Sequence, residues 1–167
     1  MGVLKLDEGL INVLVKATTD GLSMAGITPT PVGASRYLNT KHEVSSIIGF
    51  VGAVCGSISI NMSTTATKLL AGRMLGESFS ELTPETLDGM CEIVNIIAGK
   101  TKAILSTTEL KIEKISVPSV VVGSNYYLTH YRGMQTLCVE FEMPDAQKAH
   151  HNFDHMFSVS ISMMRVG

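Results

Sequence analysis

The spacing of hydrophobic residues predicts three helices. Apolar residues recur at three- and four-residue steps in residues 6–24, 63–75 and 83–106, which is typical of helices that pack one face against a core. Ser63 is a suitable N-cap for the second of these helices, and Gly76 is placed to end it.

Other segments alternate apolar and polar residues, which predicts strands. Residues 44–62 should form a hairpin that turns near Gly52. Residues 28–40 include two prolines and should form a connection or an irregular edge strand. Further strands are expected at residues 111–117, 120–122, 126–128, 137–143 and 157–164. The expected fold class is α/β (α+β), with about three helices packed on one face of a mainly antiparallel sheet.

The segment 83–106 should be a helix with two unlike faces. Thr83 is a natural N-cap, and Pro84 suits the first helical position because its missing N–H would have no partner there. The apolar stripe comprises Leu87, Met90, Cys91, Val94, Ile97 and Ala98, and should face the core. The polar stripe comprises Glu85, Asp88, Glu92, Asn95, Gly99 and Lys102, and should face water.

Stability alone does not explain the polar stripe. Asp88 and Glu92 are like charges one turn apart, which weakens an isolated helix by about 0.2–0.5 kcal/mol. Gly99 in a helix interior costs about 1 kcal/mol relative to alanine. Glu92 and Asn95 stand three positions apart, with roughly 5–6 Å between their Cβ atoms, so both can reach one bound object. Gly99 would let that object approach the helix closely.

A glutamate and an asparagine on a helix surface are most often a solvated face, so the pair alone is weak support for a site. The wider pattern is more specific: Asp88, three residues, Glu92, two residues, Asn95, and then twenty-two residues to Pro118. This pattern resembles the signature of the CheC, CheX and FliY phosphatases of bacterial chemotaxis, an aspartate or serine followed by E-x-x-N and a proline. All four positions match.

The resemblance implies a protein phosphatase, a hydrolase of two-component signalling, that dephosphorylates the phospho-aspartate of a CheY-like response-regulator receiver. Asn95 would orient the hydrolytic water and Glu92 would anchor the helix by pairing with the receiver's lysine, which makes these the catalytic residues. Asp88, Gly99 and Lys102 would bind the partner. Pro118 would be a positioning residue, although a proline at such a position most often simply ends a strand. The Mg²⁺ would belong to the receiver, and the protein would need no cofactor or metal of its own.

The helix at residues 6–24 lacks a second E-x-x-N, because the residue three positions after Glu8 is Ile11 and the residue three positions before Asn12 is Gly9. This single-site pattern resembles the CheX members of the family. The resemblance also implies a homodimer joined through its sheets, for which residues 157–164 could offer an edge. Two alternatives stay open: a non-catalytic module that binds a receiver or a flagellar-switch protein, and a structural dimer.

Composition sets the remaining limits. A chain of 167 residues with 45% hydrophobic and 17% charged residues is expected to form one domain, residues 1–167. Its net charge of −2 provides no basic field for nucleic acid. No apolar run is long enough to span a membrane and no signal peptide is evident, so a cytoplasmic location is expected.

Cysteine and histidine provide little further chemistry. Cys55, Cys91 and Cys138 are widely spaced, which argues against a disulfide framework, and all three should be buried as small apolar residues. His150, His151 and His155, together with Asp154, suggest a metal site. A solvated loop is the stronger interpretation, because the segment has no second cluster of ligands.

Overall fold

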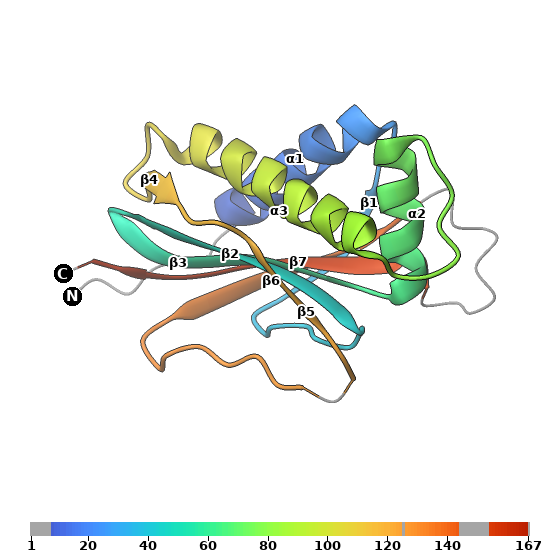
Figure 1. Ribbon diagram of the computed structural model, residues 1–167. Coiled ribbons are helices and arrows are strands. Elements are labelled where there is room, and N and C mark those ends of the chain that lie inside the picture. Colours follow the sequence, from blue (N-terminus) through green and yellow to red (C-terminus); the bar gives the residue numbers. More distant parts are fainter. Residues whose placement is uncertain (1–7, 125, 144–153, 167) are drawn as a thin grey trace.

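Seven strands form one sheet and three α-helices cover one of its faces in the computed structural model, which describes residues 8–124, 126–143 and 154–166 (Figure 1). The strands are β1 (Thr30–Ser35), β2 (Val44–Gly52), β3 (Val54–Met62), β4 (Ile112–Ile115), β5 (Ser119–Val122), β6 (Gln135–Glu142) and β7 (Met156–Arg165). Their order is β1-β6-β7-β3-β2-β4, with β5 also pairing to β2, and every pairing is antiparallel. The expected fold class is confirmed.

The helices are α1 (Glu8–Leu22), continued by the short 3-10 turn η1 (Ser23–Ala25), then α2 (Thr64–Leu75) and α3 (Pro84–Leu105). The predicted caps of α2 are present. The Ser63 hydroxyl accepts a hydrogen bond from the Ala66 N–H at 3.0 Å, and Gly76 ends the helix with a φ of +71°. A left-handed backbone of this kind suits glycine, which has no Cβ to clash.

The core lies between the sheet and the helices. Large side chains that are almost completely buried include Leu14, Ile48, Ile58, Leu70, Met90, Ile97, Phe141 and Phe157. Burial of each such side chain contributes about 1.5–3 kcal/mol. The helices approach each other closely because glycine stands where they meet: a Cβ on Gly89 would lie 3.1 Å from the Ala71 Cβ of α2. Helix α3 is therefore fixed by α1 and α2 as well as by the sheet.

The second face of the sheet carries polar residues that are nevertheless buried. Ser158, Ser160 and Ser162 of β7 are almost fully covered, because the chain around residues 36–43 and 126–134 crosses this face (Figure 1). The Ser57 hydroxyl of β3 and the His130 Nε2 lie 2.8 Å apart, which ties the second of these segments to the sheet.

Two sequence predictions about strands are wrong. Residues 126–128 are not a strand; the Tyr126 hydroxyl instead hydrogen-bonds Ser45 and, at 3.3 Å, the Asn61 amide. Residues 157–164 offer no edge, because β7 lies in the middle of the sheet between β6 and β3. The serines of β7 alternate with apolar residues, and crossing segments bury them. The edges are β1, which has a bulge between Pro31 and Gly33, and the pair β4 and β5.

Candidate functional site

Helix α3 begins where the sequence predicts. Thr83 and Thr86 form a reciprocal capping box, in which the Thr83 hydroxyl accepts from the Thr86 N–H at 3.3 Å and the Thr86 hydroxyl accepts from the Thr83 N–H at 2.9 Å. Hydrogen bonds from the Glu85 backbone N–H and then from the Thr83 side chain hold the pKa of the Glu85 carboxyl below its usual value. These contacts fix the first turn and the rotation of α3 about its axis.

The predicted division of α3 into two faces is present. The buried face comprises Thr86, Gly89, Met90, Ile93, Val94, Ile97, Ala98, Thr101 and Leu105. On the opposite side, Glu85, Asp88 and Glu92 are exposed, and Asn95, Gly99 and Lys102 are half-buried. Leu87 and Cys91 are half-buried rather than buried as expected. Ile93 lies outside the predicted apolar stripe but is buried, because α1 and α2 flank α3, a contact that the pattern of one helix does not predict.

Glu92 and Asn95 are not used by the fold. Neither side chain forms a hydrogen bond or an ion pair with any residue that the structure describes, and the same holds for Asp88 and Lys102. The surface beside Asn95 is open, since a Cβ added at Gly99 would have no atom within 4 Å outside the helix backbone. The helix thus offers a carboxylate, an amide and a flat approach to another molecule.

Cys91 lies next to this stripe, in surroundings that disfavour its thiolate form. Burial raises the pKa of the Cys91 thiol, and the negative charges of Asp88 and Glu92 raise it further. A thiol with a raised pKa stays protonated at neutral pH, and only the thiolate is a good nucleophile. The polar stripe is therefore suited to positioning and charge stabilisation, not to covalent catalysis through Cys91.

Pro118 lies in the short connection between β4 and β5. Both strands pair with β2 and both contact α3, so the connection passes along the side of the helix (Figure 1). Pro118 is half-buried there and forms no part of either strand. Strand β4 already ends at Ile115, three positions before the proline that was expected to end it, and Pro118 directly precedes β5.

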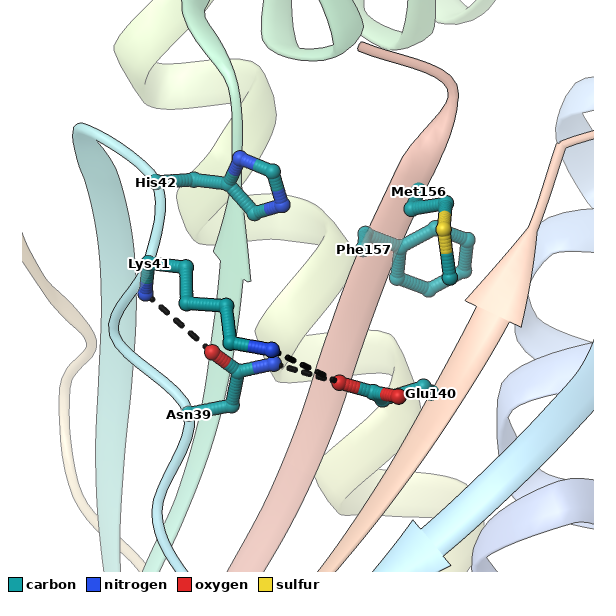
Figure 2. Close-up of a pocket in the computed structure, with 6 residues that line it drawn as sticks. All are labelled: Asn39, Lys41, His42, Glu140, Met156 and Phe157. Carbon is teal, nitrogen blue, oxygen red and sulfur yellow. Dashed lines mark hydrogen bonds and ion pairs between the residues drawn. The ribbon is translucent and has the colours of Figure 1, made fainter. Parts of the chain in front are cut away.

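A second hollow lies at the other side of the sheet and is distinct from the α3 stripe. It encloses about 510 Å³ and is lined by Asn39, Lys41, His42, Glu140, Met156 and Phe157 (Figure 2). The Asn39 amide donates to the Glu140 carboxylate at 2.7 Å, and the Lys41 Nζ lies 3.9 Å from the same oxygen. Burial lowers the pKa of His42, which keeps its ring neutral at pH 7. The polar groups of this hollow are thus largely satisfied by one another.

The histidine segment lies mostly outside the described residues, which exclude His150 and His151. His155 is described, and its Nε2 lies 3.3 Å from the Glu142 carboxylate. Within the described part of the chain no group of three or more histidine, cysteine, aspartate and glutamate side chains could hold a metal ion. None of the described helices is long and apolar enough to cross a membrane.

Three helices on one face of an antiparallel sheet form a CheC-like fold, which this chain shares with solved CheX and CheC-like proteins. The family model described as "Chemotaxis phosphatase CheX" matches residues 44–142. The chain belongs to this family, which confirms the resemblance read from the sequence, and it is accordingly a phosphatase of bacterial chemotaxis.

The similarity to known proteins extends over nearly the whole chain. The CheY-P phosphatase CheX of Thermotoga maritima is 24% identical over 158 residues, which cover 92% of this chain and 97% of that protein. The crystal structure of a chemotaxis protein CheX from Desulfovibrio desulfuricans has a TM-score of 0.78 and 26% identity, covering 93% of this chain and 99% of that one. The CheX–CheY–BeF3–Mg²⁺ complex from Borrelia burgdorferi has a TM-score of 0.75 and 23% identity, covering 96% of this chain and all of that one (100%).

Proposed function

We propose that the protein dephosphorylates the phospho-aspartate of a CheY-like receiver and that α3 is the element that enters the receiver's active site. Membership of the CheX family supports the phosphatase activity. The Thermotoga relative acts on phosphorylated CheY, and the Borrelia structure holds CheX together with CheY, BeF3 and Mg²⁺. The observation that carries the assignment to α3 is the free pair of Glu92 and Asn95 on an open helix face.

Asn95 orients the attacking water. Hydrolysis of an acyl phosphate needs a water in line with the phosphorus–oxygen bond that breaks, and phosphoryl transfer leaves the protein mainly positioning and charge stabilisation. The amide of Asn95 can accept a hydrogen bond from that water through its carbonyl oxygen and donate through its NH₂ group. No shift in a pKa is needed, and the amide is available because it has no partner among the described residues.

Glu92 fixes the helix in register. Its exposed carboxylate stands one turn from Asn95 and can pair with the lysine of the receiver beside the phosphate. Asp88 and Lys102 extend the contact along the same stripe, and Gly99 lets the receiver approach the helix backbone. The Mg²⁺ and the phosphorylated aspartate come with the receiver. Pro118 positions the connection beside α3.

The same proposal includes a cytoplasmic homodimer. Because β7 is central, the two copies would not join through residues 157–164. The molecular mass in solution tests the dimer, and a monomeric mass would contradict it.

A phosphate-release assay tests the mechanism. Candidate receivers are phosphorylated with acetyl phosphate, and release is compared for wild type, Asn95→Ala and the control Asn12→Ala, which removes an exposed asparagine from α1. Asn95→Ala should lower release at least 100-fold while binding to the beryllofluoride-activated receiver persists, and Asn12→Ala should match wild type. Normal turnover by Asn95→Ala would remove Asn95 from the mechanism. Wild type that binds but never accelerates release would be a sequestering module.

A further inference from the structure

The connection between β4 and β5 contains a β-bulge beside α3. Ile47 of β2 pairs with Ser119 and Phe50 pairs with Ile115, so two residues of β2 face three residues of the connection: Ser116, Val117 and Pro118. Regular alternation would place Ile115 and Val120 on opposite faces, because they are five residues apart. Both pack against the core under α3 instead. One extra residue therefore interrupts the edge of the sheet at this point.

Hydrogen bonds to Gly49 hold the bulge in place. The Ser116 N–H donates to the Gly49 carbonyl at 2.8 Å, and the Gly49 N–H donates to the Ser116 hydroxyl oxygen at 2.9 Å. The same hydroxyl donates to the Val117 carbonyl at 3.0 Å. Proline at position 118 has no N–H to continue the ladder. The serine side chain thus replaces a backbone partner, and the next residue is fixed outside the ladder.

Val117 is the residue that this bulge exposes, with 85% of its surface accessible. Single exposed valines are common and need no explanation. Val117 differs from them because a hydrogen-bonded bulge fixes its backbone and because bulges typically re-aim a side chain next to a functional site. The isopropyl group of Val117 is not buried in the fold, so the bulge does not contribute to the hydrophobic core through this side chain.

The position of the bulge relates Val117 to the polar stripe. One flank of helix α3 contacts β4 and β5. The opposite flank contacts α1 at Ile96 and Ile97, and α2 at Gly89. The flank that carries Cys91 and Asn95 is therefore the one turned toward β4 and β5. The three connecting residues lie between these strands, alongside the helix (Figure 1).

We infer that Val117 is an apolar contact for the receiver, placed beside Asn95 by the Ser116–Gly49 bulge. The inference rests on the proposed function, and its occupant is the surface of the receiver that surrounds the phosphorylated aspartate. A receiver docked on α3 would extend past the helix flank onto the edge of the sheet. Contact there would bury the Val117 side chain, which favours binding. A carboxylate at this position would lack that favourable burial, and its removal from water would cost free energy.

The test measures affinity and turnover separately. Val117→Asp should raise the Kd for the beryllofluoride-activated receiver, and the KM for the acetyl-phosphate-labelled receiver, about tenfold, while kcat stays within twofold of wild type. Val117→Ile should bind like wild type. The matched control is Val32→Asp: Val32 is also an exposed valine at a bulge next to a proline, 48% accessible, but on β1 at the opposite edge of the sheet. Thermal unfolding and molecular mass should be the same for all three variants.

The outcomes separate this inference from the proposed function. A Kd and KM within twofold of wild type for Val117→Asp, with turnover lost in Asn95→Ala, would overturn the inference and leave the phosphatase intact. If Val117→Asp lost affinity while Val32→Asp did not, and the wild-type protein released no phosphate, the contact would be supported and the phosphatase activity overturned. An equal loss in Val32→Asp would also overturn the inference, because the effect would not be local.

Discussion

Glu92 and Asn95 project from the same face of α3, three positions apart, and neither side chain bonds to any residue that the structure describes. The buried face of the same helix supplies Met90, Val94 and Ile97 to the core. Stability and activity are therefore assigned to opposite sides of one element. Substitutions of Glu92 and Asn95 should therefore change activity without a matching change in the free energy of unfolding, which makes the function easy to isolate experimentally.

Replacement of Glu92 by glutamine should weaken the complex and leave the fold unchanged. The substitution removes a charge that pairs with the receiver's lysine, so we expect the Kd for the activated receiver to rise about tenfold at low salt. Salt screens the wild-type pair, so the difference between wild type and Glu92→Gln should shrink as ionic strength rises. Titrations at several salt concentrations measure this, with Glu8→Gln on α1 as the exposed control. A difference independent of salt would contradict an ion pair.

Replacement of Gly99 by alanine should stabilise the protein and impair binding. An added Cβ has no atom within 4 Å, so the helix should gain up to about 1 kcal/mol from the better propensity of alanine. The same methyl group would stand where the receiver approaches, and leucine would obstruct it further. We expect a higher melting temperature together with a higher Kd in the order glycine, alanine, leucine. Asn12→Leu on α1 controls for added surface bulk, and unchanged affinity in Gly99→Leu would exclude close approach at this point.

The reactivity of Cys91 should report on the charges of the stripe. Asp88 and Glu92 contribute to the raised pKa of its thiol, in addition to burial. Removal of either charge should lower that pKa and increase the thiolate fraction. Alkylation of Cys91 at pH 8, followed by peptide mass spectrometry, should therefore be slow in wild type and faster in Asp88→Asn and Glu92→Gln. Docking of the activated receiver should slow it again, and equal rates in all variants would contradict the electrostatic contribution.

The sequence was a good guide to α3 because its signals are local. Thr83 and Pro84 mark the start, and the three- and four-residue spacing separates the buried face from the stripe of Glu92 and Asn95. A helix surface needs no distant partner to be recognised. The spacing of these residues to Pro118 added the family signature, although the bulge that surrounds Pro118 depends on pairing with β2 and is invisible in the sequence.

The strand order and the burial of the second sheet face could not be predicted, because both depend on contacts between residues far apart in the sequence. Serines alternate with apolar residues in β7, and they are buried by segments far away in the chain. Asn61 shows how this is achieved. Its amide donates to the His42 carbonyl at 2.9 Å and to the Ser45 hydroxyl at 2.9 Å, and it accepts from the His42 N–H. Such long-range polar contacts make a polar residue a core residue.

The segment held by His130 gives the fold a dependence on pH. The His130 ring lies 2.8 Å from the Ser57 hydroxyl, and burial lowers its pKa below the ordinary value of 6.5; burial also lowers the pKa of His42. The unfolded chain therefore binds more protons than the folded chain below about pH 6.5. The free energy of unfolding should be at its full value above that pH and should fall as the pH drops from 6.5 through the lower folded pKa values.

Chemical denaturation between pH 7.5 and 5 measures this loss of stability. His130→Gln keeps a polar side chain without a titrating ring, so its stability curve should be flatter over this range than that of wild type. The double variant with His42→Gln should be flatter still, because the two histidines contact different parts of the second sheet face and their contributions should add. A pH profile of His130→Gln that parallels wild type would show that the ring is not kept neutral by burial against the sheet.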